Sequence, residues 1–362
     1  MLTRSGFLCH GSCAVLVIPL HGPEAPCLGG GSVVETPLHY DSTCLFFRAR
    51  IFSGELFLNY LVTGGAGFIG SHIVEALVAK GDGAVRVIDN LRSGRAQNLD
   101  GMDVEFVEGS ITDEALLDRA VANVDAVFHL AAMVSVPETM KHPRECMEIN
   151  TLGTLQLLAA ARRSGVQRIV FSSTSAVYGD DPVQPKLESM NPQPLSPYAV
   201  SKLNSEMAVR ILGKQLGIRA AALRYFNVYG PRQDPNSAYA AAIPIFVARA
   251  LRNEDIVIYG DGEQTRDFVF VKDVVQANLL ALEKGEGIYN VGAGNTVTIN
   301  ELARQIISMT RSKSEIIHAD PRPGDVKHSS ADVTRMKEIG FEPKEERDEA
   351  LGRTVDYFMS NS

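Results

Sequence analysis

Residues 60–70 read YLVTGGAGFIG, and this stretch decides the fold. Its first four residues form an apolar run that suits a buried parallel strand, and the apolar residues of 71–80 recur with helical spacing. Gly64 permits a tight turn, Gly67 lets backbone N–H groups approach a phosphate, and Gly70 lets the helix pack against the strand. The stretch therefore predicts a strand, a glycine turn and a helix.

Phe68 and Ile69 lie in the turn just before this helix, where backbone N–H groups are expected to bind a pyrophosphate at the helix N-terminus. A second apolar strand, residues 85–88, ends in Asp89, close to the interval of about 20 residues expected for a carboxylate that binds an adenosine ribose. Such a carboxylate accepts hydrogen bonds from the ribose 2′-hydroxyl and repels a 2′-phosphate. The sequence thus predicts NAD rather than NADP, although the nearby Arg92 complicates this prediction.

Strands and helices continue to alternate after this unit. Apolar runs at 104–107, 126–130 and 168–172 predict strands, and residues 114–120 and 150–164 predict helices. This alternation predicts an α/β fold with a doubly wound parallel sheet that carries helices on both faces. Ligands bind beyond the carboxyl ends of such strands. Further cofactor contacts are therefore expected at Asn90, Ser110, Ile111, Leu130, Ala131 and Ala132.

A candidate catalytic group begins at Ser196, in the sequence SPYAVSK. Ser196 can cap a helix and Pro197 suits its first turn, so Tyr198 and Lys202 are expected four residues apart on one face. The ammonium of Lys202 and a positive nicotinamide ring both favour the phenolate, so we expect the pKa of Tyr198 to be lowered. Thr174 can donate a hydrogen bond to the same substrate oxygen. We therefore predict Tyr198 as the catalytic acid/base, assisted by Lys202 and Thr174.

The composition of the 362-residue chain excludes several classes of partner. The formal net charge is -8 and no block of basic residues occurs, so nucleic acid is not expected to bind. No apolar stretch reaches the roughly 18 to 20 residues that cross a bilayer, so no membrane segment is expected. Only Cys146 lies in the enzyme-like part, which favours a reducing compartment such as the cytoplasm.

The first 57 residues look separate from the rest, because they follow neither a helical nor a strand period for long. We expect a disordered extension, or a start codon placed too early. The apolar run 13–20 is a weaker signal for a secretory leader. Cys9, His10 and Cys13 lack a second ligand pair at zinc-finger distance, so no metal site is predicted.

Several motifs together resemble the extended short-chain dehydrogenase/reductase superfamily, in its NAD-dependent epimerase/dehydratase branch. They are TGGAGFIG, VIDN, HLAA, SST, YAVSK, LRYFNVYGPRQ, GDGEQTRDFVFVKD, YNVG and RPGDVKHSSAD. The resemblance implies a Rossmann-like domain at 58–225 and a smaller C-terminal substrate-binding lobe, mainly 226–362. It also implies a homodimer, formed through helices near 150–164 and 198–216. Relatives often carry an aspartate where this chain has Ser110.

The same resemblance implies a nucleoside diphosphate sugar as substrate. Asn227 would contact the diphosphate, Asp325 the ribose, and three arginines the phosphates. These arginines are Arg232, Arg266 and Arg322. Dehydratases of the branch have an Asp-Glu pair directly after the threonine, whereas this chain has Ser175 and Ala176, which disfavours dehydration.

Similarity to the UDP-hexose 4-epimerases of this branch implies that Tyr198 takes the 4-hydroxyl proton while hydride passes to bound NAD and later returns to the opposite face. Ser329 is a small residue at a position that flanks the sugar, so we expect UDP-N-acetylglucosamine as well as UDP-glucose to be accepted. A UDP-glucuronate decarboxylase or 4-epimerase is the nearest alternative. A non-catalytic NAD-sensing protein is the alternative from another class.

Overall fold

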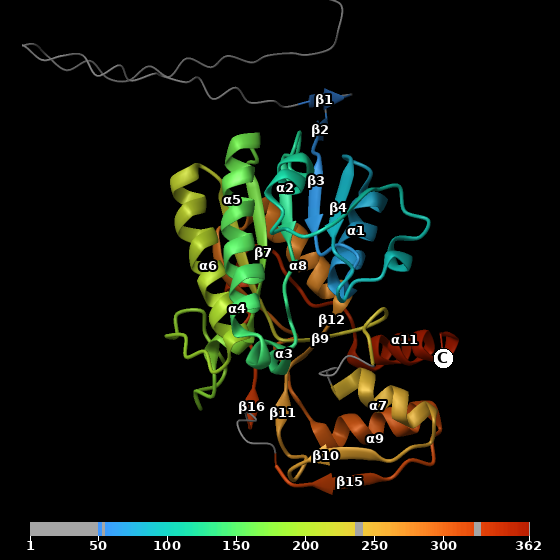
Figure 1. Ribbon diagram of the computed structural model, residues 1–362. Helices are drawn as coiled ribbons and strands as arrows, with labels where there is room; N and C mark the ends of the chain where they lie inside the picture. The colour runs from blue at the N-terminus through green and yellow to red at the C-terminus, as the bar shows by residue number, and fades with distance from the viewer. Residues whose placement is uncertain (1–49, 53–54, 236–241, 322–326, 362) are drawn as a thin grey trace, which may run out of the picture. The chain divides into compact units, whose positions relative to one another are not determined.

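The computed structural model describes residues 50–52, 55–235, 242–321 and 327–361 (Figure 1). The chain divides into two compact units, Met1–Phe57 and Leu58–Ser362. In the first unit, β1 (Arg50–Phe52) pairs with β2 (Glu55–Phe57) in antiparallel register. The rest of the predicted extension, with Cys9, His10 and Cys13, lies outside the described residues. No helix within the described ranges is long and apolar enough to span a bilayer.

A seven-stranded parallel sheet forms the centre of the second unit. Its strand order is β13-β8-β7-β6-β3-β4-β5. The strands are β3 (Tyr60–Thr63), β4 (Val85–Asp89), β5 (Glu105–Glu108), β6 (Ala126–His129), β7 (Arg168–Thr174), β8 (Arg219–Tyr225) and β13 (Gly287–Val291). The chain leaves the central β3 first to one side, through β4 and β5, and then to the other, through β6, β7 and β8. This is the doubly wound order, which leaves a crevice beyond the carboxyl ends of β3 and β6.

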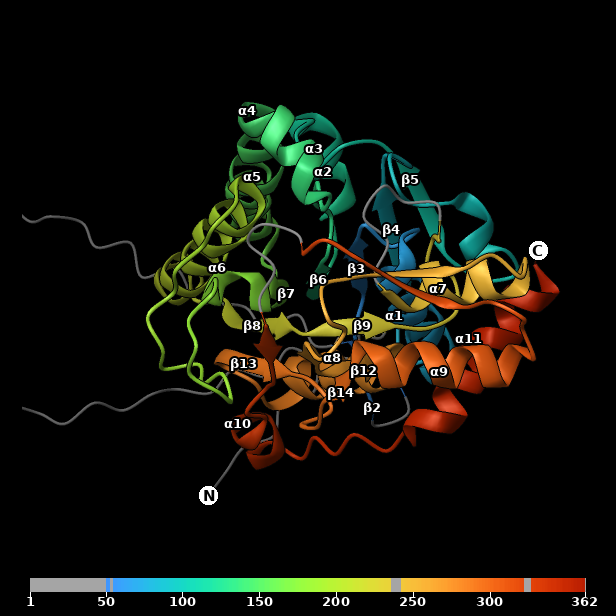
Figure 2. The ribbon, with the colours of Figure 1, turned by 90° about the horizontal axis from the view of Figure 1, so that it is seen from below.

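Helices cover both faces of the sheet (Figure 2). One apolar cluster joins the sheet to α1 (Phe68–Lys80) and α8 (Val271–Lys284), and a second joins it to α2 (Glu114–Ala120), α5 (Gly153–Ser164) and α6 (Pro197–Leu216). The central strands β3 and β6 are buried at every residue, which explains why their sequences are almost continuously apolar, whereas the edge strand β5 exposes Glu105 and Glu108. The predicted Rossmann-like α/β fold class is therefore confirmed.

The C-terminal part of the chain forms a smaller lobe beside the carboxyl edge of the sheet (Figure 1). Three small sheets build it, ordered β12-β9, β14-β11-β16 and β10-β15. Their strands are β9 (Asn227–Tyr229), β10 (Ile256–Tyr259), β11 (Thr265–Arg266), β12 (Phe268–Phe270), β14 (Val297–Thr298), β15 (Ile316–Ala319) and β16 (His328–Ser329). Its helices are α7 (Ala242–Leu251), α9 (Ile299–Thr310) and α11 (Arg347–Ser360), whereas α10 (Thr334–Glu338) packs against β13 of the large sheet. A separate apolar cluster holds α7, α9 and α11 together.

Two predicted helices differ from the structure at their starts. The helix expected at 71–80 begins at Phe68, because Gly67 already serves as its N-cap. The helix expected at 150–164 is preceded by α3 (Val136–Lys141), α4 (Pro143–Cys146) and a π-helical turn, η2 (Met147–Leu152), before α5 begins. π-helical turns of this kind within a helix are frequent at functional sites. Two short 3-10 helices, η1 (Ala96–Leu99) and η3 (Ser175–Tyr178), complete the unit.

Candidate active site

The glycine turn after β3 packs directly against the chain that follows β6. Gly64 has a φ of +70°, and a Cβ added to it would lie 2.8 Å from the backbone nitrogen of Ala131. A Cβ on Gly70 would lie 2.2 Å from the carbonyl oxygen of Gly64. Neither position has room for a larger residue. The turn thus lies at the crevice where the strand order reverses.

The N-terminus of α1 is open for an anion. Its N-cap is Gly67, whose lack of a side chain leaves no capping hydrogen bond, and the first turn carries no acidic residue. The N–H groups of Phe68 and Ile69 at such an end have no carbonyl of their own helix to bind. Together with the positive end of the helix dipole they fit a pyrophosphate.

Asp89 lies at the end of β4 next to this turn. Its Oδ2 accepts a hydrogen bond from the backbone nitrogen of Ala66 at 3.0 Å, and its Oδ1 accepts one from Leu91 at 2.9 Å. Burial raises the pKa of Asp89, and these two backbone bonds oppose the rise. A carboxylate has about four acceptor sites, so two remain for a ribose diol. The site therefore fits the adenosine end of a dinucleotide.

The remaining predicted cofactor residues follow neighbouring strands at the same edge. The backbone nitrogens of Leu130 and Ala131 each donate to Thr63 Oγ1 at 3.2 Å, which ties the chain after β6 to β3. Ser110 Oγ lies 2.8 Å from the Thr112 hydroxyl and accepts a hydrogen bond from the Thr112 backbone. The Ser110 hydroxyl thus already has a partner on its own loop.

Tyr198, Thr174 and Lys202 come together at the carboxyl edge of β7. Ser196 caps α6 by accepting a hydrogen bond from the backbone of Ala199 at 3.2 Å, as the sequence predicts. Thr174 is the last residue of β7, and its side chain is hydrogen-bonded to Tyr198. Lys202 is buried, with its ammonium 4.4 Å from the centre of the Phe171 ring. The phenol therefore lies on the same edge of the sheet as the glycine turn.

The sequence predicts a lowered pKa for Tyr198. When the side chains of the protein act alone, without the nicotinamide ring, this prediction is wrong. Burial raises the pKa of Tyr198 to about 12, against a smaller opposing effect of the hydrogen bond with Thr174. Burial also lowers the pKa of Lys202 to about 7, although Cys146 and Glu206 oppose this shift. For both groups desolvation is the largest cause, and it disfavours the charged form of each.

Two buried polar networks hold this catalytic group, and sequence reasoning missed both. Asn150, in the π-helical turn, accepts a hydrogen bond from the Met133 backbone at 2.7 Å and donates to Ser201 Oγ at 2.9 Å. In the other network, Glu206 forms a two-point ion pair with Arg224 and accepts a hydrogen bond from Ser173, the neighbour of Thr174. Arg224 lies within the LRYFN motif, which is the only sequence signal for this network.

The smaller lobe brings two predicted substrate residues into register. Arg266 on β11 is the parallel partner of Ser329 on β16. Asn227 begins β9 and donates from its side chain to the carbonyl of Asp267 at 3.0 Å. Asp267 itself is fully buried, and its carboxylate accepts three backbone hydrogen bonds, which come from Ala293, Gly294 and Ala331.

Gln184 is a further residue that the sequence did not reveal. Its amide nitrogen donates to the His328 carbonyl at 2.7 Å, and its oxygen accepts from the Ser330 backbone at 3.0 Å. The Gln184 side chain therefore forms hydrogen bonds with the residues directly before and after Ser329.

Arg232 contacts the first helix of the large unit, whereas Arg266 lies on β11 of the smaller lobe. The Arg232 guanidinium pairs with Glu75 of α1 at 2.9 Å and donates to Ser71 Oγ at 3.4 Å. This residue therefore lies against the helix that follows the glycine turn. Arg322 and Asp325 fall outside the described residues.

Comparison with known proteins agrees with this geometry. A family model described as the NAD dependent epimerase/dehydratase family matches residues 60–292. The chain belongs to this family. A relative from Methanocaldococcus jannaschii, named a putative UDP-glucose 4-epimerase, is 38% identical over 304 residues, covering 83% of this chain and 99% of the relative.

Two further matches of this epimerase/dehydratase chain differ in their named reactions. The solved structure of a UDP-N-acetylglucosamine 4-epimerase from Methanobrevibacter ruminantium, in complex with UDP-N-acetylmuramic acid, has a TM-score of 0.81 and 43% identity, over 84% of this chain and 99% of that one. A UDP-N-acetyl-alpha-D-glucosaminuronate decarboxylase from Bacillus cytotoxicus is 36% identical over 319 residues, covering 82% of this chain and 97% of the relative.

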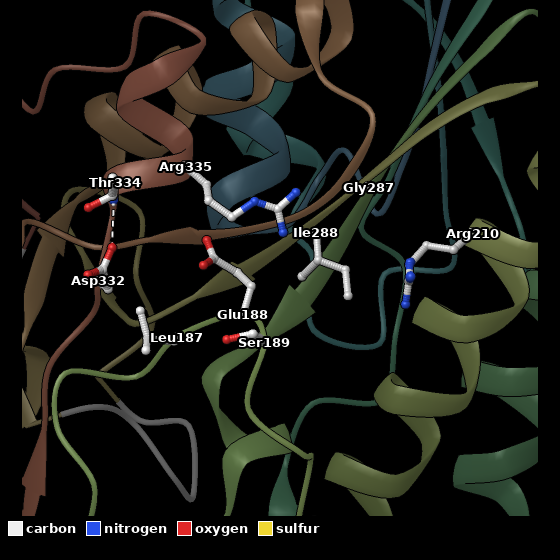
Figure 3. A pocket seen from close by; sticks show the side chains of 9 residues that line it. All are labelled: Leu187, Glu188, Ser189, Arg210, Gly287, Ile288, Asp332, Thr334 and Arg335. Atoms are coloured by element: carbon white, nitrogen blue, oxygen red, sulfur yellow. Dashed lines mark hydrogen bonds between the residues drawn. The ribbon is translucent and has the colours of Figure 1, made fainter.

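A cavity of about 480 Å³ lies away from the predicted site residues of this epimerase/dehydratase chain (Figure 3). It is bounded by α6, α10, the start of β13 and residues 187–189. Glu188 at its wall accepts a hydrogen bond from the Asn290 backbone at 2.7 Å, which is a structural role. Within the described ranges no group of three or more histidine, cysteine or acidic side chains could hold a metal ion.

Replacing Lys202 with methionine is expected to stabilise the protein near neutral pH. The pKa of Lys202 is about 7 in the folded protein and 10.5 for an unperturbed lysine side chain, so between these values the unfolded chain binds more protons and wild-type stability rises with pH. The methionine variant should gain up to about 4 kcal/mol in free energy of unfolding at pH 7, and little near pH 10.5. Urea unfolding at both pH values measures this, with the exposed Lys214→Met on the same helix as control. A loss of stability at pH 7 would contradict the burial argument.

Proposed function

We propose that this chain is a NAD-dependent 4-epimerase of UDP-hexoses, which interconverts UDP-glucose with UDP-galactose and the corresponding N-acetyl sugars. The hydrogen-bonded pair of Tyr198 and Thr174, at the same sheet edge as the glycine turn, carries this proposal. The epimerases among the related proteins support it.

The residues of the chain itself handle the proton and the sugar oxygen. Tyr198 takes the proton of the 4-hydroxyl and later returns it, and Thr174 donates a hydrogen bond to the same oxygen. The glycine turn, the N-terminus of α1 and Asp89 would hold NAD, which would supply reversible hydride transfer at carbon 4. The positive nicotinamide ring of bound NAD would favour the phenolate. This effect would offset the effect of burial on the pKa of Tyr198. Ser175 and Ala176 supply no carboxylate for eliminating water.

The smaller lobe is proposed to bind the UDP part of the substrate. Arg266 and Asn227 lie on neighbouring segments of this lobe, and the sequence assigns Arg322 and Asp325 to the same task. Arg232 is proposed to reach phosphate from its place against α1, where Glu75 holds it. Guanidinium groups suit phosphate oxygens because they offer two parallel donors.

A product assay tests the proposed reaction. Purified protein is offered UDP-glucose, UDP-N-acetylglucosamine and UDP-glucuronate separately, without added reductant, and the products are followed by proton NMR. We expect the 4-epimers of the first two. Decarboxylation is the second candidate, favoured by the Bacillus cytotoxicus relative. Carbon dioxide and a UDP-pentose from UDP-glucuronate, with UDP-glucose unchanged, would establish decarboxylation instead.

Replacing Ser329 with tyrosine is expected to remove the N-acetyl sugars from the substrate range. A bulky ring at this position would fill the space that the acetamide needs, and overpacking of this kind costs about 1–3 kcal/mol. The ratio kcat/KM for UDP-N-acetylglucosamine should fall about 10- to 200-fold, while that for UDP-glucose stays within about threefold. Ser329→Ala is the control and should keep both substrates. Equal loss of both in the tyrosine variant would contradict the proposed pocket.

We also propose a homodimer formed through α5 and α6. Exposed apolar side chains follow one stripe of α6, at Val200, Met207 and Ile211, and Leu152 before α5 is half exposed. A second copy of the same surface would cover them. Light scattering should give twice the chain mass of 39.2 kDa.

A cytoplasmic location is proposed on the unpaired Cys146, the only cysteine among the described residues.

A further inference from the structure

Arg92 is held by two carboxylates from another part of the fold. It follows Asp89 by three residues, and its guanidinium contacts Glu138 of α3 at 2.7 Å and Glu145 of α4 at 2.5 Å. These contacts also lower the pKa of the Glu145 carboxyl. Both carboxylates come from the chain after β6, whereas Arg92 comes from the chain after β4.

The backbone at this point is fixed independently of the ion pairs. Asp89 Oδ1 accepts the N–H of Leu91, Asn90 Oδ1 accepts that of Arg92, and Leu91 has a φ of +57°. These backbone hydrogen bonds therefore hold the main chain of Arg92 in a turn next to Asp89. The two carboxylates determine only where the Arg92 side chain lies. Arg95, further along, pairs with Asp234 instead.

A cation at this place in a dinucleotide site has a specific consequence. An arginine near the second strand accommodates the 2′-phosphate of NADP, whereas a carboxylate binds the 2′-hydroxyl of NAD. The chain carries both residue types within four positions, Asp89 and Arg92, so local sequence alone leaves cofactor choice ambiguous.

We propose that Glu138 and Glu145 are positioning residues for cofactor choice, because they hold the Arg92 guanidinium away from the ribose 2′ position and leave that position to Asp89. This inference rests on the dinucleotide site of the proposed function. Exposed pairs of this kind are individually weak, so the expected effect on cofactor choice is modest.

An exchange experiment tests the inference. Wild type and E138Q/E145Q are equilibrated with equal concentrations of isotope-labelled NAD and of NADP. Incubation continues until the labelled NAD has replaced the unlabelled NAD that was bound at purification. The bound dinucleotides are then extracted and quantified. We expect wild type to hold almost only NAD, and the double variant to raise the bound NADP to NAD ratio about tenfold. The triple variant R92Q/E138Q/E145Q should return to the wild-type ratio. Glu148→Gln, which removes the partner of Arg144 instead, is the matched control and should change nothing.

Three results would overturn the inference. One is an unchanged ratio in E138Q/E145Q when thermal unfolding shows that the variant is folded. The second is a raised ratio that persists in the triple variant, since the effect would then not pass through Arg92. The third is binding of neither dinucleotide by wild type, which would overturn the proposed function too. NAD binding with an unchanged ratio leaves the proposed function intact.

Discussion

Replacing Tyr198 with phenylalanine is expected to lower kcat for UDP-glucose epimerisation about 10²- to 10⁴-fold, the usual contribution of a general acid/base. The ring keeps its packing in α6, and only the oxygen that hydrogen-bonds Thr174 is lost. Bound NAD should therefore remain at the wild-type level. The readouts are the epimerisation rate by NMR and the dinucleotide released on denaturation.

Tyr357→Phe in α11 is the matched control for this prediction. The ring of Tyr357 packs against Phe358 in the smaller lobe, in a helix that carries no predicted site residue. Its loss of a hydroxyl should leave both kcat and NAD content unchanged. Activity within a few fold of wild type in Tyr198→Phe would exclude the tyrosine as the group that moves the proton.

Replacing Glu206 with glutamine is expected to lower the free energy of unfolding by about 3–5 kcal/mol, because it leaves the charge of Arg224 buried without a carboxylate. Both side chains are about 1% exposed, and their two hydrogen bonds measure 2.7 and 3.0 Å. Nη1 of Arg224 already lacks a hydrogen-bond partner within the described residues, so little compensation remains. Chemical unfolding followed by circular dichroism measures the change.

Glu254→Gln provides a matched comparison, because Glu254 forms the same two-point contact with Arg252 at the surface. An exposed pair of this kind contributes at most about 1 kcal/mol. The double change Glu206→Leu with Arg224→Met should recover much of the lost stability, since it removes both charges. If Glu206→Gln lowers the free energy of unfolding no more than Glu254→Gln does, the buried ion pair does not stabilise the fold as proposed.

Local patterns predicted the parts of the site that depend on short sequence separations. The glycine turn, its helix and Asp89 lie within about 30 residues of each other, and the cap and four-residue spacing of Tyr198 and Lys202 lie within one helix. The structure places all of these at one edge of the parallel sheet. The fold class followed from the same alternation of strands and helices.

Long-range contacts account for what the sequence could not reveal. Asp267 receives backbone hydrogen bonds from residues 26, 27 and 64 positions away, and no local pattern marks such a residue. The raised pKa of Tyr198 has the same origin, because burial is set by the packing of the whole unit. Arg92 is a third example: its charge was visible in the sequence, but its two partners lie 46 and 53 residues away.

In the proposed reaction one hydrogen leaves carbon 4 of the sugar and returns to the same carbon without exchange with water. Incubating the purified protein with UDP-glucose deuterated at carbon 4, in ordinary water, tests it most directly. We predict UDP-galactose that retains the deuterium at carbon 4, as measured by NMR and mass spectrometry. UDP-galactose that carries protium from water at this carbon would contradict the account.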